Sequence, residues 1–523
     1  MKKIIIYLRS NLPLLLFLIP TITFSQDGMF DVTFNGNGKQ FLSLPNKSIY
    51  GWQVLVLDDD RILVGGNAMQ GNIYDLILAA YLPDGTLDTL FADNGMLIIL
   101  HGTNGNSGLR GMLQQADGKI LLSAKVDNTD KLIRLNTNGK IDSTYGVNGM
   151  VNANPGSGYI AQQNNHILLS GYFFDGTVRY YNFSRYNTDG TYDTTFGNNG
   201  IARLNPTTYN FNLIYAVKIQ SDGKILVAGT SYNSGVDRKP VLVRLNVDGS
   251  LDTSFGNNGV IIETLGVEEM GIFTSLDILP DGKIIAAGNM EYTGGTGGFG
   301  GNKPAVVKYH QNGTLDSTFA THGKLILSTF FGANDDLRAM LVQPDNKIII
   351  GGQSGSAFPN IQSYFYISRL NADGTYDNTF GNSGSVLTIF NNSETNANVK
   401  IVFQDDYKII TSALSRDTAD NLFNTVICRF GNDNSLSISS ASSVNDDILI
   451  YPNPFSSYTT LIFSEEQKNS TIKIIDVLGR QIKEINFTGK ELIIEKGMMK
   501  EGIYFVQTTD EKRNIVNKKI IIQ

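Results

Sequence analysis

One phrase recurs seven times in the sequence, and this repeat constrains the fold more than any other feature. Residues 189–200 read DGTYDTTFGNNG, and residues 248–259 nearly reproduce them. More divergent copies lie at residues 84–95, 138–149, 312–323 and 373–384, and a truncated copy occupies residues 30–38. Intervals of 51 to 64 residues separate the aspartates that mark the copies, which are Asp31, Asp88, Asp142, Asp193, Asp252, Asp316 and Asp377. Such regular spacing indicates one structural unit used repeatedly.

Each unit is predicted to contain four strands. A second phrase, clearest as SDGKILVAG at residues 221–229, alternates with the first. In the fifth unit, apolar or alternating runs at residues 260–264, 273–279, 283–287 and 305–309 predict strands, and no helical period is sustained. Four-stranded units repeated at this length are typical of propeller blades. The predicted fold is therefore all-β, with a seven-bladed β-propeller over residues 27–430.

The two ends of the repeat region complement each other. After the last predicted strand, residues 425–430, the expected copy of the first phrase is missing. The truncated copy at residues 30–38, in contrast, has no strands before it. A ring that closes with its N-terminal segment requires this arrangement, because closure leaves no edge strand exposed.

Both phrases resemble the delta-60 repeat family, whose pattern joins a D-G-K-I-L-V-A-G strand to an L-N-x-D-G-x-L-D-x-x-F-G-x-x-G connector. Residues 222–229 and 245–259 match it almost position by position. The resemblance implies a propeller and implies no common activity. It is weakest at residues 164–171 and 405–413.

Charge and targeting signals narrow the location and the partners. Lys2, Lys3 and Arg9 precede an apolar run over residues 12–24, which predicts a signal peptide over residues 1–25. No later stretch is long and apolar enough to predict a transmembrane span in the mature chain. The net charge of −7, which falls to −10 without those three cations, argues against a nucleic acid partner. The single cysteine, Cys428, excludes an intramolecular disulfide and a cysteine-based zinc site.

The composition changes after the repeats. A linker rich in Ser and Asn is predicted over residues 431–447. Beyond it, alternating Ile-rich runs at residues 471–475, 491–494, 503–507 and 518–522 predict a small immunoglobulin-like β-sandwich over residues 448–523.

This tail resembles the type A C-terminal sorting domain of the type IX secretion system. The resemblance implies docking on the outer-membrane translocon of that system, with the protein released or displayed at the cell surface. An ordinary accessory sandwich is the alternative. The matching motif residues are Tyr451, Pro452, Asn453, Pro454, Gly479, Arg480, Gly502, Tyr504, Lys518 and Lys519.

Few residues suggest chemistry, and we predict neither a catalytic group nor a cofactor. The four histidines form no metal-binding spacing, and the GTGGFG run at residues 295–300 is followed by Lys303-Pro304 and a strand rather than a helix. A ring of aspartates could hold calcium. The alternative is that each aspartate caps nearby backbone amides. The weak calcium candidates are Asp88, Asp193, Asp252, Asp316 and Asp377.

Three functions remain open: a binding module, a polysaccharide hydrolase or lyase with a site at the central channel, and a passive surface-layer component. We favour binding of an extracellular glycan or protein. Loops on one face of the ring vary in length, and loops on a rigid scaffold commonly carry function. The candidate contact residues on these loops are Arg238, Phe299 and Phe358.

Overall fold

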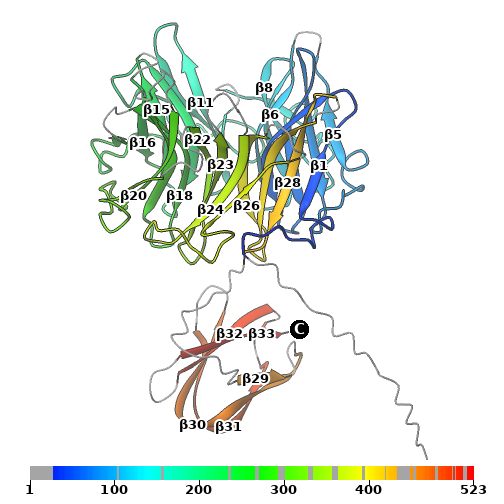
Figure 1. The fold of residues 1–523 in the computed structure, drawn as a ribbon, viewed down its shortest axis with the longest axis vertical. Coiled ribbons are helices and arrows are strands. Elements are labelled where there is room, and N and C mark those ends of the chain that lie inside the picture. Colours follow the sequence, from blue (N-terminus) through cyan, green and yellow to red (C-terminus); the bar gives the residue numbers. More distant parts are fainter. Residues whose placement is uncertain are drawn as a thin grey trace, which may run out of the picture. The chain divides into compact units, whose positions relative to one another are not determined.

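A computed structural model describes most of the chain after residue 26. It covers residues 27–102, 105–154, 158–233, 237–265, 270–292, 301–327, 334–355, 363–390, 395–417, 420–432, 448–451, 455–476, 481–497, 499–500, 502–509 and 515–522. The chain divides into two compact units between Ser435 and Leu436. All the elements in these residues are β-strands, so the all-β prediction is confirmed (Figure 1). Within these residues no helix is long and apolar enough to cross a membrane.

Four sheets of the first unit contain four antiparallel strands each. One contains β2 (Ser48–Val56), β3 (Ile62–Gln70), β4 (Ile73–Tyr81) and β5 (Met96–Ile99). The next contains β6 (Gly108–Gln114), β7 (Ile120–Val126), β8 (Thr129–Leu135) and β9 (Met150–Asn152). A third contains β18 (Met270–Ile278), β19 (Ile284–Tyr292), β20 (Gly301–Tyr309) and β21 (Lys324–Ile326). The fourth contains β22 (Asn334–Val342), β23 (Ile348–Gly355), β24 (Ser363–Leu370) and β25 (Ser385–Thr388).

An eight-stranded sheet lies between the second and third of these in chain order. Its first half contains β10 (Ile160–Gln163), β11 (His166–Phe174), β12 (Arg179–Tyr186) and β13 (Ile201–Leu204). Its second half contains β14 (Phe211–Ile219), β15 (Ile225–Tyr232), β16 (Lys239–Leu245) and β17 (Val260–Ile262). A single parallel pair, Arg179 opposite Phe211, joins the halves.

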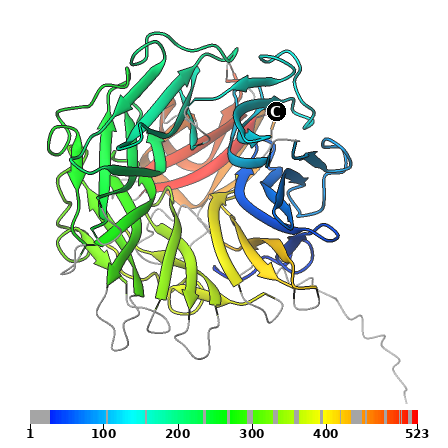
Figure 2. The same cartoon turned by 90° about the horizontal axis from the view of Figure 1, so that it is seen from above.

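The remaining sheet of this unit joins its two ends. It contains β26 (Thr395–Phe403), β27 (Ile409–Arg416), β28 (Phe423–Phe430) and, at its edge, β1 (Lys39–Leu42). Lys39 lies opposite Cys428, and Phe30 bridges to Phe430. The N-terminal segment thus completes the last sheet, as the truncated repeat predicts. Seen from above, the sheets surround a central axis (Figure 2).

The aromatic residue of each first phrase packs between neighbouring sheets. All seven of these side chains are fully buried: Phe34, Phe91, Tyr145, Phe196, Phe255, Phe319 and Phe380. Each ring also explains a repeated glycine. A Cβ on Gly249 would lie 2.7 Å from the ring of Phe196, and the φ of Gly249 is +87°. The Asp-Gly pair is therefore kept for close packing against the preceding aromatic ring as well as for its turn.

The second unit is a five-stranded sheet with its own core. It contains β29 (Ile448–Tyr451), β30 (Tyr458–Asp476), β31 (Gln481–Glu495), β32 (Gly502–Thr509) and β33 (Ile515–Ile522). Phe455, Leu461, Phe463 and Ile472 are among its buried residues. Because it has a core of its own, we treat it as a separate folding unit.

Candidate functional site

The seven repeated aspartates form a network of buried ion pairs. None is more than 6% exposed. In each, Oδ1 accepts a hydrogen bond from the backbone N–H two residues later. The Oδ2 atom of Asp252 lies 2.6 Å from Nε of Arg244 and 2.9 Å from Nζ of Lys224. In the other copies Oδ2 likewise faces an arginine or lysine, and Asp31 reaches Lys408 and Arg429 from the far end of the repeat region. Asp88 pairs with Arg61 alone.

This network leaves little capacity for a metal ion at the calcium candidates. Both carboxylate oxygens of Asp193, Asp252, Asp316 and Asp377 already have partners, and at least one partner of each is cationic. A calcium ion would have to displace that cation. Across the described residues, no group of three or more His, Cys, Asp or Glu side chains is placed to hold a metal. His166 occupies the position of the turn lysine, with Nε2 3.4 Å from Asp193.

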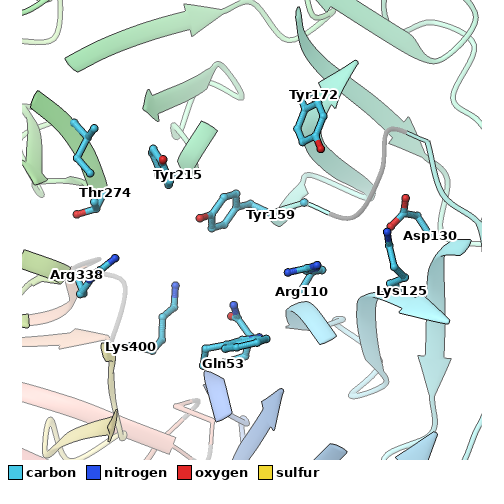
Figure 3. A pocket seen from close by; sticks show the side chains of 13 residues that line it. Gln53, Arg110, Lys125, Asp130, Tyr159, Tyr172, Tyr215, Thr274, Arg338 and Lys400 are labelled. Carbon is cyan, nitrogen blue, oxygen red and sulfur yellow. The ribbon is translucent and has the colours of Figure 1, made fainter. Parts of the chain in front are cut away.

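A cavity of about 920 Å³ is lined by residues from the innermost strands around the central axis of the ring. The innermost strand of every sheet, or half-sheet, contributes to its lining, except that the third contribution comes from the residues directly before β10. Figure 3 shows these side chains converging from all sides. The lining residues are Trp52, Gln53, Arg110, Lys125, Asp130, Gly158, Tyr159, Tyr172, Tyr215, Ile272, Thr274, Arg338 and Lys400.

A β-bulge aims the key side chains into the channel. The register of five innermost strands shifts by one residue against the next strand, and the extra residue is Trp52, Arg110, Tyr215, Thr274 or Arg338. The bulge brings backbone atoms close to a glycine of the second phrase. A Cβ on Gly229 would lie 1.9 Å from the carbonyl oxygen of Leu213. The glycine in LVAG therefore permits the bulge, and the bulge re-aims the side chain.

The cavity carries more positive than negative charge. Four cations line it, Arg110, Lys125, Arg338 and Lys400, against one carboxylate, Asp130. Arg338 pairs with Asp336. In the described part of the chain, Arg110, Lys125 and Lys400 have no hydrogen-bonded or ion-paired side-chain partner. The buried Oδ1 of Asp130 is also unpartnered among these residues.

Burial shifts the ionisation of two groups in the channel. The side chain of Lys400 is open to the cavity, but the surrounding protein and the positive charge of Lys218 lower its pKa. Lys218 itself is paired with Asp277 at 2.8 Å. Burial raises the pKa of Tyr159 to about 12. The cavity therefore presents the neutral phenol of Tyr159 beside lysine and arginine side chains.

The predicted loop and sorting residues are only partly described. Arg238 lies directly before β16, with its guanidinium carbon 5.7 Å from the ring centre of Tyr232. Phe299 and Phe358 lie outside the described residues, as do Pro452, Asn453, Pro454, Gly479 and Arg480. Tyr451 ends β29, Gly502 begins β32, which also holds Tyr504, and Lys518 and Lys519 lie in β33. The hydroxyl of Tyr504 donates to the carbonyl of Lys500 at 3.0 Å.

Sequence reasoning missed the channel residues, although a signal for them exists. Trp52, Arg110, Tyr215, Thr274 and Arg338 each stand five residues before the Leu or Gln that opens the Asp-Gly-Lys-type turn. Chemically different residues occupy this position in otherwise similar repeats. A polar or aromatic residue at this position, within a strand that is otherwise apolar in the other repeats, indicates a side chain that points into the channel instead of packing between neighbouring sheets.

Comparison with known families identifies both parts of the chain. Residues 57–91, 115–145, 162–196, 220–255, 279–319 and 343–380 match the beta-propeller "Domain of unknown function (DUF5122)", with which the delta-60 naming is consistent. Residues 449–523 match the "Secretion system C-terminal sorting domain". The chain carries six DUF5122 propeller repeats and a type IX sorting domain. Both resemblances seen in the sequence are thereby confirmed.

Similarity to characterised proteins is more limited. An endo-acting ulvan lyase from Formosa agariphila is 34% identical over 90 residues, which are 17% of this chain and 17% of that protein. A fungal alcohol oxidase of the AA5 family, solved with copper, is 14% identical, with a TM-score of 0.45 over 93% of this chain and all of that one. PorZ, a surface component of the type IX secretion system of Porphyromonas gingivalis, is 14% identical, with a TM-score of 0.38 over 90% of this chain and 59% of that one.

Proposed function

We propose that this protein is an exported binding module that holds an anionic ligand in the channel of a seven-bladed propeller. The type IX sorting domain marks the chain for secretion to the cell surface or beyond. Seven blades follow if the halves of the eight-stranded sheet are counted separately. The proposal includes cleavage of residues 1–25 as a signal peptide, residues 431–447 as a linker, and an immunoglobulin-like sandwich over residues 448–523 that docks on the translocon.

The observation that carries the proposal is a set of channel cations that have no hydrogen-bonded or ion-paired side-chain partner among the described residues. The connector cations, such as Lys224 and Arg244, are matched with the repeated aspartates, whereas Arg110, Lys125 and Lys400 have no such partner and line one cavity. Holding cations in a partly enclosed space costs free energy through desolvation and mutual repulsion. A bound anion would offset this cost. The cavity also has the size of a typical small-ligand site.

The test is a glycan and matrix-protein array, followed by titration calorimetry with any anionic hit. We expect the double variant Arg110→Gln/Lys400→Gln to lower affinity at least about 100-fold, since two charge-assisted contacts are each worth about 1.5–3 kcal/mol. Lys140→Gln is the matched control, because Lys140 is an exposed lysine outside the cavity. Equal loss in the control, or no loss in the double variant, would place the site elsewhere.

The second candidate is an enzyme that cleaves an acidic polysaccharide in the same cavity. Lys400 supports it, because an amine with a lowered pKa has a larger neutral fraction that can accept a proton. The ulvan lyase likeness is compatible with a lyase but spans only 90 residues. Incubation with acidic polysaccharides decides the matter: a lyase produces ultraviolet absorbance from a new C=C bond, a hydrolase produces only reducing ends, and a binding module produces neither.

A further inference from the structure

We propose that a ladder of aromatic and arginine side chains extends the channel site outward, so that the ligand is a chain of an anionic polysaccharide longer than the cavity itself. This inference rests on the proposed function, because the ladder begins at the cavity wall. Its first member, Tyr172 of β11, lines the cavity and is 51% exposed. The ladder continues through Arg179, Phe211 and Tyr232 to Arg238.

Each step of the ladder is a close contact between a planar cation and a ring, or between two rings. The guanidinium carbon of Arg179 lies 4.2 Å from the ring centre of Tyr172 and 5.8 Å from that of Phe211. The rings of Phe211 and Tyr232 stack at 5.2 Å with an angle of 13° between their planes. The guanidinium carbon of Arg238 lies 5.7 Å from the ring centre of Tyr232.

Strand pairing fixes the path of this ladder. Tyr172 and Arg179 belong to the β11–β12 hairpin, and Arg179 is the residue that pairs with Phe211 at the start of β14. The N–H of Arg179 also donates to the carbonyl of Asn210 at 2.7 Å. Phe211 faces Tyr232 at the end of β15, and Arg238 stands directly before β16. Because β14, β15 and β16 follow one another outward from the channel, the ladder runs away from the cavity across the ends of these strands.

The chemistry of the ladder favours an acidic sugar chain. An aromatic ring offers an apolar, electron-rich face, against which the C–H face of a pyranose packs. Guanidinium groups bind carboxylates and sulfates in planar, paired geometry. Arg179 makes no side-chain hydrogen bond or ion pair within the described residues, and its buried Nε is unpartnered there. Rings and arginines also suit single-stranded nucleic acids, so oligo-dT is one of the probes in the experiment below.

The experiment compares short and long ligands on the whole secreted protein. The probes are galacturonate trimer, polygalacturonate, dextran sulfate, neutral dextran and oligo-dT, each titrated at low and high salt. We expect polygalacturonate or dextran sulfate to bind at least about tenfold more tightly than the trimer, with salt weakening both. Arg179→Met/Arg238→Met should abolish that gain and leave trimer affinity unchanged. Which of the two polymers binds identifies carboxylate or sulfate as the recognised group.

The matched control is Arg203→Met. Arg203 also stacks on a ring, 3.9 Å from the centre of Phe173, but it belongs to β13, outside the ladder. If the unmodified protein binds the trimer as tightly as the longer chains, the ladder is wrong and the channel site still stands. This comparison does not depend on whether a variant folds. No binding of any anion overturns the proposed function itself. Equal binding of neutral dextran, or tighter binding of oligo-dT, overturns the acidic polysaccharide as ligand.

Discussion

The charged side chains of the repeated connectors are paired with one another, whereas several of those that line the channel are not. At the connectors, each buried aspartate faces at least one cation, as Asp252 faces Arg244 and Lys224. In the channel, three cations without an ion-paired partner among the described residues line one cavity, and its single lining carboxylate, Asp130, lies opposite Lys125 in the β7–β8 pair. The connectors use charge to fix one geometry seven times. The described lining of the channel holds more cations than carboxylates, which suits a bound anion.

The largest expected effect comes from titrating the connector network with acid. For Asp316, burial raises the pKa, but hydrogen bonds from Thr318 and Lys283 outweigh it and leave the pKa at about 2. The pKa values of Asp31, Asp142, Asp193, Asp252 and Asp377 are also lowered. Their stabilisation is complete above the unfolded value of 3.8 and is lost as pH falls through the lower folded values. Calorimetry should show the melting temperature of the ring falling steeply between about pH 4 and about pH 2. A flat profile would contradict the network.

A single buried pair should have the next largest effect. Asp252→Asn keeps an acceptor for Ser254 but leaves Arg244, which is 7% exposed, without its carboxylate. We expect a loss of about 3–5 kcal/mol in the free energy of unfolding, measured by urea denaturation. The control is Asp59→Asn, which breaks the 2.8 Å pair with Arg61 but removes a carboxylate that is 55% exposed and leaves Arg61 its second partner, Asp88, so it should cost at most about 1 kcal/mol. Equal costs would remove the distinction between buried and exposed pairs.

The smallest effect on stability is expected in the channel. Because folding lowers the pKa of Lys400, the charged form of this side chain disfavours the folded state. Lys400→Met should therefore leave the free energy of unfolding unchanged within about 0.5 kcal/mol, or raise it slightly, while anion affinity falls. Urea denaturation of the two proteins side by side measures this difference. A loss as large as that of Asp252→Asn would show that Lys400 supports the fold rather than a ligand.

The repeats predict the propeller because each repeated residue makes the same kind of contact in every blade. The Asp-Gly turn, the aromatic residue and the LVAG glycine recur since each meets the same contact in each copy: Gly249 against Phe196, and Gly229 beneath a bulge. The strands predicted from the sequence agree with the observed strands to within a few residues, as with the predicted run 273–279 and the observed β18 (Met270–Ile278).

The channel could not be predicted in the same way, because it depends on residues that do not recur. Arg110, Tyr215 and Arg338 occupy equivalent positions, and only the ring brings them together. Nothing in their local sequence announces a charge left without a partner. Arg238 was named for its place on a variable loop, but its stacking on Tyr232 depends on the pairing of β14 with β15.

The seam of the ring has a consequence for the order of events during synthesis and export. β1 finds its partner only in β28, where Lys39 lies opposite Cys428, so the first strand must wait until almost the whole repeat region exists. Closing so long a loop costs entropy that grows only slowly with length, but contacts between distant segments slow folding. Until β1 pairs with it, β28 presents an open edge to any other strand. The sorting domain follows β28 in the chain. A polypeptide that contains the sorting domain therefore also contains β1 and β28, the two strands that close the ring.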